Sequence, residues 1–389
     1  MKYVFVALAI VAIALALTAE AKAPKWHALT EGYTFDKYVR DFGKGYVKGS
    51  EEWSRREALY TAQLKKVMTH NAVAKAKGLH HEGINHMSDW TSAELRRING
   101  GIPPMGGETA LRKSKPKHVH TYNGEQLPHS VDWRTATNPP VLTGIKNQGM
   151  CGDCWGHSAT ESMESHYSIY SGQLHVMSQQ QVTSCMPDPE GCGGQGGCAG
   201  GFAELAFDYV ETAGGIHQEW VYPFTSYHGD TGTCILHNNT APVAAVKGYV
   251  AVERNNAAAT MHALATKGPL SIYVDASMWS AYEGGIFKQE SGCQYNMNIS
   301  MDHVVQLVGY GHDFDTAEDY WIVRNSWGAA WGEAGYIRLH RPAETPCGWN
   351  TPNAMHCSGG PSKVWACGLC GLLMDPLYPL MGDYEGPPV

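Results

Sequence analysis

Apolar side chains recur at helical spacing in the first quarter of the chain. One series begins at Phe35 and ends at Tyr46, and a second runs from about Ser50 to Ala76. Ser50 suits the start of a helix, because its hydroxyl can accept a hydrogen bond from a free backbone N–H. The pattern predicts a helical hairpin. Residues 100–126, rich in Gly, Pro, Lys and His with no apolar period, predict an exposed linker that is easily cleaved.

A third helical pattern begins at Cys154 and keeps an apolar face as far as Gly172, which is suited to end a helix. Shorter helices are predicted over Ser178–Val182 and Phe202–Val210. Residues 186–201 between them are crowded with Gly, Pro and Cys, which predicts irregular, cross-linked chain.

Beyond about Ala241 the pattern changes to β-rich runs. The expected strands are Val243–Val252, Leu270–Val274, Val304–Tyr310, Tyr320–Asn325 and Tyr336–Leu339, with one helix over Ala257–Lys267. A mainly helical half followed by a mainly β half predicts an α+β protein with a cleft between two lobes.

The extreme N-terminus differs from the rest. Lys2, an apolar run from Val4 to Leu17 and small residues at 19–23 predict a secretory signal peptide over residues 1–21. The run is short for a membrane span, which needs about 20 residues. We therefore expect a mature protein outside the cytosol with no membrane attachment.

Composition agrees with a secreted globular chain. Of 389 residues, 43% are hydrophobic and 17% are charged. The 11 cysteines are an odd number, so one free thiol and five disulfides would account for all of them in an oxidising compartment. Sequons at Asn238 and Asn298 predict glycosylation.

Charge divides unevenly along the chain. Residues 1–126 carry 19 Lys and Arg against 12 Asp and Glu, a net charge of +7, whereas residues 127–389 carry 10 against 25, a net charge of −15. The two parts should attract each other, and acid should weaken that attraction, helped by His118, His120 and His129. The basic part lacks a dense Lys/Arg run, so nucleic acid is not an expected partner.

Candidate chemistry gathers in the run from Gln148 to Trp155. A cysteine at the start of a helix, Cys154, has a stabilised thiolate, and the Gln148 amide could stabilise an oxyanion. Alone, such a cysteine is more often half of a disulfide or a buried apolar residue. Attack on an acyl group also needs a base, and His303 and Asn325 are candidate partners downstream.

The order Gln148, Cys154, His303, Asn325, followed by Ser-Trp-Gly, resembles the papain-like cysteine proteases, although His303 and Asn325 follow Cys154 by 149 and 171 residues, more than usual. Asp153 and His157 depart from the family pattern. Upstream, one residue series resembles the propeptide helix of these zymogens, with Tyr, Gln and Val in place of the usual Phe, Asn and Ile; it comprises Glu52, Arg56, Tyr60, Gln63, Val67 and Asn71. Gly83, Asn85, Met87 and Asp89 resemble the second propeptide motif.

The resemblance implies a papain-like two-lobed fold. Residues 22–126 would be a helical inhibitory propeptide, and the mature domain would span residues 127–389. Its helical lobe would cover 127–240 and its β-barrel-like lobe 241–389. Protein and peptide substrates and the chain's own propeptide are the implied partners. We expect a monomer without cofactor or metal.

The family also implies residue roles. Cys154 would be the nucleophile, His303 its acid/base partner, Asn325 the residue that orients His303, and Trp327 a shield over that contact. Gln148 and the Cys154 backbone N–H would form the oxyanion hole. The implied lining of the substrate cleft is Gly200 and Gly201 for the peptide backbone and Phe202, Ala203, Tyr273, Val304 and Leu372 for an apolar side chain.

The implied disulfides are Cys151–Cys198, Cys185–Cys234 and Cys293–Cys367. The four remaining cysteines allow three pairings that the sequence leaves open; they are Cys192, Cys347, Cys357 and Cys370. A zinc site near His356 is a weaker reading in a secreted chain. Residues 342–366 form an insertion relative to the family.

Two other functions stay open. An exopeptidase of the same fold is one, although Met186–Gly197 lacks the histidine that occluding loops of such enzymes carry. A non-catalytic binding module is the other, although such relatives usually replace the nucleophile. The expected location is the secretory pathway, either a lysosome or acidic vacuole or the extracellular space.

Overall fold

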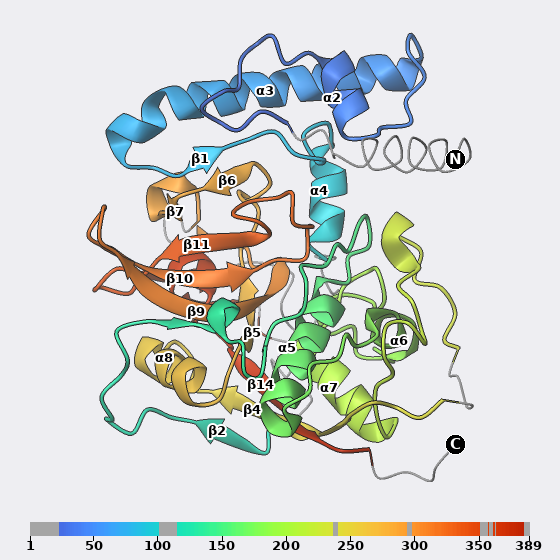
Figure 1. Cartoon of the computed structure of the whole chain (residues 1–389), viewed down its shortest axis with the longest axis vertical. Helices are drawn as coiled ribbons and strands as arrows, with labels where there is room; N and C mark the ends of the chain where they lie inside the picture. Colours follow the sequence, from blue (N-terminus) through green and yellow to red (C-terminus); the bar gives the residue numbers. More distant parts are fainter. Residues whose placement is uncertain are drawn as a thin grey trace, which may run out of the picture.

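The described chain is helical first and mainly β later, as the residue pattern predicts. The computed structural model describes residues 23–100, 115–235, 240–293, 298–350, 357, 361 and 363–384. The predicted signal peptide and Asn238 lie outside them. A layer of helices lies over a body that contains one large sheet and a central helix (Figure 1).

The helical layer is the predicted hairpin. It consists of α2 (Phe35–Asp41) and α3 (Glu51–Lys77), followed by β1 (His81–Glu82) and α4 (Ser92–Ile98). The Ser50 hydroxyl accepts a hydrogen bond from the Trp53 backbone N–H at 3.1 Å, which confirms the predicted cap. Buried aromatic rings fill the space between α2 and α3. Because β1 pairs with β6 (Tyr282–Gly284), the layer is joined to the body by backbone hydrogen bonds.

Three helices make the first lobe of the body. They are α5 (Cys154–Ser171), α6 (Gln179–Cys185) and α7 (Ala203–Thr212). Gly172 ends α5 with a φ of 78°, a left-handed conformation that glycine adopts readily. Helix α5 is buried on almost all sides and lies at the centre of the molecule (Figure 1).

A nine-stranded, mainly antiparallel sheet makes the second lobe. Its order is β2-β4-β14-β5-β9-β10-β11-β7, with β3 paired to β9. The strands are β2 (His118–His120), β3 (Val131–Asp132), β4 (Ala245–Val252), β5 (Leu270–Val274), β7 (Ile286–Phe287), β9 (His303–Asp313), β10 (Glu318–Arg324), β11 (Tyr336–His340) and β14 (Leu377–Gly382). Helix α8 (Ala257–Thr266) packs on it, and short 3-10 turns cover Trp133–Thr135, Ser226–His228, Gln289–Ser291 and Leu369–Gly371. Among the described residues the first and last strands of this order, β2 and β7, do not pair with each other, so the sheet does not close into a barrel.

Serine side chains join α5 to the sheet. The Ser158 hydroxyl donates to the Val305 carbonyl oxygen at 2.9 Å, and Ser162 and Ser271 share a hydrogen bond of 2.9 Å. One turn further on, Gln306 donates to the Ser165 hydroxyl at 3.0 Å. Because these residues are buried, their paired hydroxyls allow a close helix–sheet contact without unsatisfied polar groups. The seam holds the start of α5 beside the start of β9.

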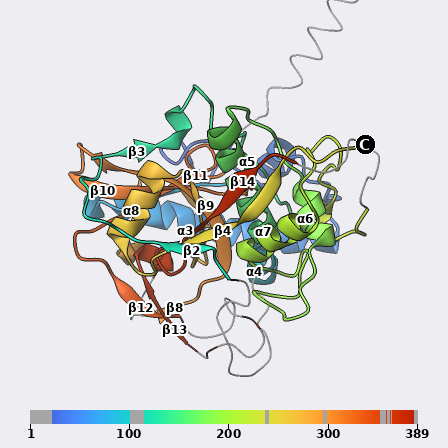
Figure 2. The same cartoon turned by 90° about the horizontal axis from the view of Figure 1, so that it is seen from below.

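Part of the predicted linker forms a strand, which the sequence pattern did not predict, although most of residues 115–126 are exposed as expected. Residues 118–120 form β2, which pairs in parallel with β4 at one edge of the sheet (Figure 2). Lys117 donates its backbone N–H to the Tyr249 carbonyl, and Glu253 donates to the His120 carbonyl, both at 2.9 Å. The edge of β4 offers backbone groups that need partners, which a reading of local composition does not detect. Residues 101–114 are not described.

The insertion builds a small second sheet. Strands β12 (Cys347–Asn350) and β13 (Val364–Cys367) pair with each other, and β12 pairs with β8 (Asn298–Ile299). This sheet lies at the side of the body (Figure 2). Asn298 is exposed at its edge, and its glycosylation stays a prediction.

All ten other cysteines are paired, and Cys154 is the free one, as expected. The disulfides are Cys151–Cys198, Cys185–Cys234, Cys192–Cys357, Cys293–Cys370 and Cys347–Cys367. The predicted Cys293–Cys367 bond is wrong. Cys367 lies directly opposite Cys347 in the β12–β13 pair, so the inserted hairpin takes Cys367 as its own partner and leaves Cys370 for Cys293.

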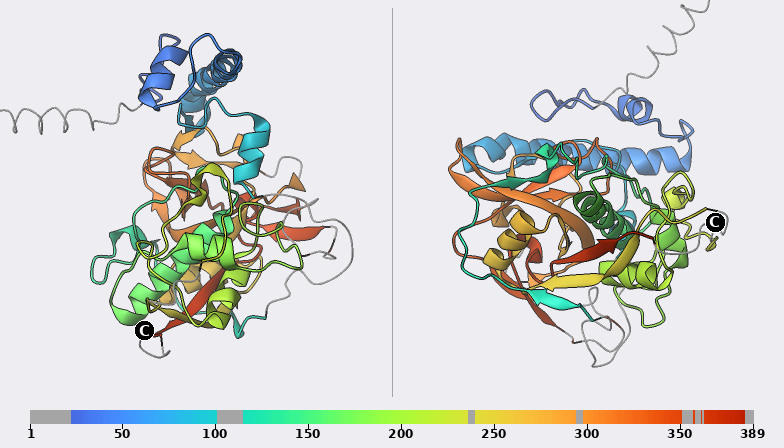
Figure 3. Two further views of the ribbon diagram at one scale, coloured as in Figure 1. Left: turned by 90° about the vertical axis from the view of Figure 1, so that its right-hand side faces the viewer. Right: turned by 60° about the horizontal axis from the view of Figure 1, so that its bottom comes forward.

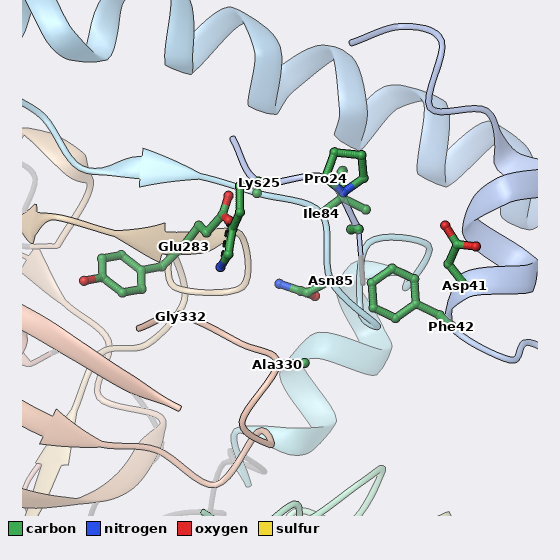
Figure 4. Close-up of a pocket in the computed structure, with 12 residues that line it drawn as sticks. Pro24, Lys25, Asp41, Phe42, Ile84, Asn85, Glu283, Ala330 and Gly332 are labelled. Carbon is green, nitrogen blue, oxygen red and sulfur yellow. Dashed lines mark ion pairs between the residues drawn. The ribbon is translucent and has the colours of Figure 1, made fainter. Parts of the chain in front are cut away.

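The N-terminal segment reaches over the body beside β6. Lys25 forms an ion pair of 3.1 Å with Glu283. Both side chains line a cavity of about 340 Å³ between the helical layer and the body, shown in Figure 4. Asn85, which also lines it, donates to the Ser280 carbonyl at 2.7 Å. No helix in the described ranges is both long and apolar enough to cross a bilayer.

A buried arginine also bridges α5 and the sheet. Arg324 of β10 is fully buried; it donates to the Thr143 hydroxyl at 3.0 Å and to the Gly144 carbonyl at 2.6 Å. Its Nε lies 3.4 Å from a carboxylate oxygen of Glu161, which is buried in α5. Burial raises the pKa of Glu161, and Arg324 opposes that rise. Each charge therefore depends on the other to remain in the interior.

Replacing one member of this pair should destabilise the fold. We expect Arg324→Met to lower the free energy of unfolding by about 3–5 kcal/mol, because Glu161 is left buried without its cation. Urea unfolding of the Cys154→Ala chain, which cannot process itself, measures the loss. The double variant Arg324→Met/Glu161→Gln is the matched control and should be more stable than Arg324→Met alone. Equal stability of the Arg324→Met and parent chains would contradict this role.

Candidate active site

The thiol of Cys154 lies at the N-terminus of α5. The side chain is buried, and its Sγ lies 3.8 Å from the Asn99 carbonyl oxygen in the helical layer's last segment. The adjacent Cys151–Cys198 disulfide ties this loop to residues 198–201. A helix N-terminus favours negative charge, so the fold places the thiol where a thiolate is stabilised once it is exposed to solvent.

His303 and Asn325 come from neighbouring strands of the sheet. His303 is the first residue of β9, and Asn325 follows the last residue of β10. His303 Nε2 and Asn325 Oδ1 are 2.8 Å apart. Asn325 Oδ1 also accepts from the Ser326 backbone N–H at 2.8 Å, which identifies it as the amide oxygen. Because this oxygen can only accept, His303 carries its proton on Nε2 and has its lone pair on Nδ1.

Trp327 covers the His303–Asn325 contact. Its ring stacks on the His303 ring, with centroids 5.0 Å apart and planes 28° apart. Both His303 and Asn325 are fully buried. His303 Nδ1 is buried and has no hydrogen-bond partner among the described residues, so the lone pair is available to a nearby proton donor. The predicted shielding by Trp327 agrees with this geometry.

Gln148 is held by the segment that follows Asn325. The Ser326 hydroxyl donates to Gln148 Oε1 at 2.6 Å, and the Gln148 backbone N–H donates to the Ser326 carbonyl at 2.9 Å. Gln148 Nε2 then donates to the carbonyl oxygens of Cys151 and Ile98, at 2.8 and 2.7 Å. The Ser326 contact therefore aims the amide N–H groups toward the cleft.

The end of the helical layer occupies the cleft. Helix α4 descends from the layer toward α5 (Figure 3, left), and Ile98 and Asn99 place their carbonyl oxygens near Gln148 and Cys154. Glycines make this approach possible. A Cβ added to Gly200, whose φ is 95°, would lie 2.1 Å from the Gly100 carbonyl oxygen. A Cβ on Gly152 would lie 2.5 Å from the Arg97 carbonyl oxygen. These contacts come from residues 97–100, which end a helix and form a turn, so the pairing of Gly200 with an extended peptide stays a prediction.

Covering the cleft keeps both catalytic candidates neutral. Burial raises the pKa of the Cys154 thiol to about 12, with Asp153 and Asp302 adding to the rise. Burial also lowers the pKa of His303 to about 4. A thiolate and an imidazolium are both disfavoured in this state. The burial to which Asn99 contributes at Cys154 therefore disfavours the charge separation that a thiol nucleophile requires.

Asp153 is engaged by its own partners. Its carboxylate accepts a hydrogen bond from the Thr183 hydroxyl at 2.9 Å and lies 3.3 Å from His157 Nδ1. Burial opposes protonation of His157, but the Asp153 carboxylate outweighs it and raises the His157 pKa. The two departures from the family pattern thus compensate each other, because His157 offsets charge that Asp153 places beside Cys154.

The predicted specificity residues fall into two groups. Phe202, Ala203, Tyr273 and Val304 are buried in the same apolar cluster as Cys154, whereas Leu372 belongs to the other core cluster and does not join them. Glu204 was not predicted; its buried carboxylate accepts a hydrogen bond from the Tyr273 hydroxyl. Gly201 packs against Trp155, where an added Cβ would lie 2.8 Å from the indole.

Sequence reasoning also missed Asp302 and Ser326. Asn99 donates to an Asp302 carboxylate oxygen at 3.0 Å, which links the covering segment to the residue before His303. Burial and the nearby Asp275 raise the pKa of Asp302. Both residues stand next to predicted catalytic ones, so adjacency in sequence was the available signal. Their roles depend on partners from distant parts of the chain.

The site combines a buried thiol, a histidine with an unpaired ring nitrogen and the side-chain amides of Gln148 and Asn325. This combination, on a two-lobed fold, is typical of a thiol-dependent acyl transferase or hydrolase. Residues 127–356 match the model of the papain family cysteine proteases, and residues 35–95 match the cathepsin propeptide inhibitor domain. The chain belongs to the papain family and is a cysteine protease zymogen.

Curated relatives share nearly the whole chain. A cathepsin L-like protein of Caenorhabditis elegans is 35% identical over 88% of this chain and 96% of its own length. Bovine cathepsin S is 33% identical over 86% of this chain and 95% of its own. Two rice relatives are longer, and the matched regions cover 62% and 56% of them.

Solved zymogens have the same fold. The digestive procathepsin L2 of Tenebrio molitor superposes with a TM-score of 0.71 at 27% identity, over 88% of this chain and 98% of that one. The recombinant stem bromelain precursor gives a TM-score of 0.68 at 31% identity, over 90% and 98%. The helical layer and α4 therefore correspond to a propeptide.

Gln148, which carries the donor amide, should contribute more to catalysis than Ser326, which orients that amide. We expect Gln148→Ala to lower kcat by about 10²–10³, a barrier increase of about 2.7–4 kcal/mol, because one oxyanion donor is lost. Ser326→Ala keeps the donor but loses its orienting bond, so we expect a fall of roughly tenfold. Steady-state hydrolysis of a fluorogenic peptide by the matured variants measures both. An unchanged kcat in Gln148→Ala would contradict the assignment.

Proposed function

We propose that the matured chain is an endopeptidase in which Cys154, His303, Asn325 and Gln148 act together. The observation that carries this proposal is the hydrogen bond from Gln148 Nε2 to the Ile98 carbonyl oxygen, 2.7 Å long. The carbonyl oxygen of the next residue, Asn99, lies 3.8 Å from Cys154 Sγ. The donor that we assign to the substrate carbonyl thus already binds a carbonyl oxygen of the propeptide. The same donor would then stabilise the oxyanion.

The reaction follows from these positions. His303 Nδ1 takes the thiol proton, and Cys154 Sγ forms a bond to the substrate carbonyl carbon. Gln148 Nε2 and the Cys154 backbone N–H stabilise the resulting oxyanion. His303 returns the proton to the amine nitrogen as the C–N bond breaks, which leaves a thioester. Water, deprotonated by His303, then cleaves the thioester and restores the thiol.

Substrate selectivity rests on the wall formed by Phe202, Ala203, Tyr273 and Val304. These side chains are apolar at the surface of the cluster that contains Cys154, and the Tyr273 hydroxyl is already bonded to Glu204. A charged side chain entering here would be desolvated without a free partner among them. We therefore propose a preference for an apolar residue one position before the scissile residue.

A peptide-library assay tests the function and its alternatives. We expect the matured enzyme to cut internally quenched peptides that are blocked at both ends, with apolar residues preferred before the scissile residue. Matured protein carrying Cys154→Ala should have no activity, because the nucleophile is absent. Cleavage only of peptides with a free terminus would favour an exopeptidase. Absence of cleavage, with no alkylation of Cys154, would favour a non-catalytic module.

Histidines of the propeptide with lowered pKa values explain activation by acid better than the attraction between a basic propeptide and an acidic mature part. Among the described residues, few ion pairs link the propeptide to the mature part; those of Lys25 with Glu283 and of Lys117 with Glu211 involve exposed lysines. Exposed pairs contribute little. By contrast, burial lowers the pKa of His86 and His120 to about 4 each. We therefore propose that an acidic compartment of the secretory pathway promotes maturation.

The sign of the pH effect follows from the lowered pKa values. A histidine whose pKa falls on burial contributes stability above pH 6.5, and that stability is lost as the pH falls toward 4. Propeptide removal should therefore be faster at about pH 4.5 than at about pH 7. His120 contacts His262 and Tyr378, and the charges of His118 and Lys267 also act on it. Glu125 lies 3.5 Å from His262 Nε2. His120→Gln should reduce the difference between the two rates, measured by gel analysis of processing. Equal rates for the parent at both pH values would contradict the proposal.

A further inference from the structure

Three ligand-type side chains converge in the propeptide, far from Cys154. His70 lies on α3, His80 precedes β1, and Glu82 lies in β1 (Figure 1 shows α3 above β1). Their candidate ligand atoms lie within 4.8 Å of one another. His70 Nδ1 and His80 Nε2 are each 3.9 Å from the same Glu82 oxygen. These distances are too long for hydrogen bonds.

Two of these groups are buried and have unpaired polar atoms. The side chains of His80 and Glu82 are 2% and 7% exposed. Within the part of the chain that the structure describes, His80 Nε2 and Glu82 Oε2 have no hydrogen-bond partner. Burying a carboxylate and an unpaired imidazole nitrogen is costly, and a cation held between His80 Nε2 and the Glu82 carboxylate would compensate for that cost.

The surrounding hydrogen bonds direct the lone pairs inward. His70 Nε2 lies 2.8 Å from the His80 carbonyl oxygen, which can only accept, so the neutral ring keeps its lone pair on Nδ1, facing Glu82. His80 Nδ1 lies 3.0 Å from the Ser291 hydroxyl, which can accept its proton and leave Nε2 free. Metal-binding histidines are usually oriented by such contacts on the second ring nitrogen.

We propose that His70, His80 and Glu82 bind one Zn²⁺ ion in the zymogen. Two imidazole nitrogens and a carboxylate oxygen suit Zn²⁺, with water as the fourth ligand. The side chain of His70 is 18% exposed, which gives such water access. Zinc bonds of about 2.0–2.2 Å place tetrahedral ligand atoms roughly 3.3–3.5 Å apart. The two histidine–carboxylate distances of 3.9 Å would therefore shorten by about half an ångström, and the two histidine nitrogens, which lie within 4.8 Å of each other, by at most about 1.5 Å.

The site would join the propeptide more firmly to the mature part. His80 packs on Phe287 and Tyr282, with ring centroids 4.7 and 5.8 Å away, and hydrogen-bonds Ser291. Tyr282 lies in β6, the strand that pairs with β1. Phe287 lies in β7, and Ser291 lies in the 3-10 turn that follows β7. A metal bridging α3 and β1 would therefore stabilise the helical layer where it docks. This inference does not depend on the enzyme's substrate preference.

Metal binding can be measured without enzymatic activity. The parent for the test is the full zymogen with Cys154→Ala, which has no free thiol and cannot process itself. Calorimetric titration with Zn²⁺ alone should give one site. His70→Gln and Glu82→Gln should weaken it by at least about tenfold, because each removes a ligand. His118→Gln, which removes an exposed propeptide histidine, is the matched control and should bind as the parent does.

Two further readouts keep the result interpretable. Zn²⁺ should raise the melting temperature of the parent and of His118→Gln but not of Glu82→Gln, since only a bound ligand stabilises the folded state. Co²⁺ in the parent should give the intense visible absorption of a four-coordinate site, a measurement that needs no variant. Absence of Zn²⁺ binding to the parent, or equal affinity in parent, His70→Gln and Glu82→Gln, would overturn the proposal.

Discussion

The contact between α5 and the central strands is the constraint on which the site depends. Cys154 is at one end of α5, and His303 and Asn325 are at the ends of β9 and β10, so their spacing is set by how the helix docks on the sheet. Buried serine hydroxyls and Arg324 stabilise this helix–sheet contact through paired polar groups, and the contact is therefore not purely apolar. Such groups need specific partners, so they favour one orientation of the helix over others.

The propeptide inhibits by occupying the cleft and by changing its electrostatics. Residues 97–100 fill the space beside Gly152 and Gly200 and present carbonyl oxygens to Gln148 and Cys154. The same burial raises the thiol pKa and lowers the imidazole pKa, so the covered site lacks the charged pair that attack requires. One interaction therefore supplies both steric exclusion and chemical inactivation.

The departures from the family pattern have local physical explanations. Asp153 and His157 both depart from the pattern, and they form a buried pair with each other. The inserted β12–β13 hairpin brings Cys347 opposite Cys367 and so changes the partner of Cys293. In the propeptide, β2 extends the sheet edge, although its composition resembles a linker. The residue that pairs with Asp153 lies one helical turn away, whereas Cys367 and β2 pair with residues more distant in sequence.

The sequence by itself determined most of the helices, the five strands β4, β5, β9, β10 and β11, the candidate catalytic set and the number of free thiols. Those features follow from periodicity, caps, residue order and an odd cysteine count, which are local or can be counted. The bounds of α5 and β5 agree with the periodicity to the residue or nearly so. Tertiary structure alone decided the open sheet, the disulfide partners, the roles of Ser326 and Glu204, and the meeting of His70, His80 and Glu82. These depend on which side chains meet across the fold, and side-chain spacing along the chain carries no information about that.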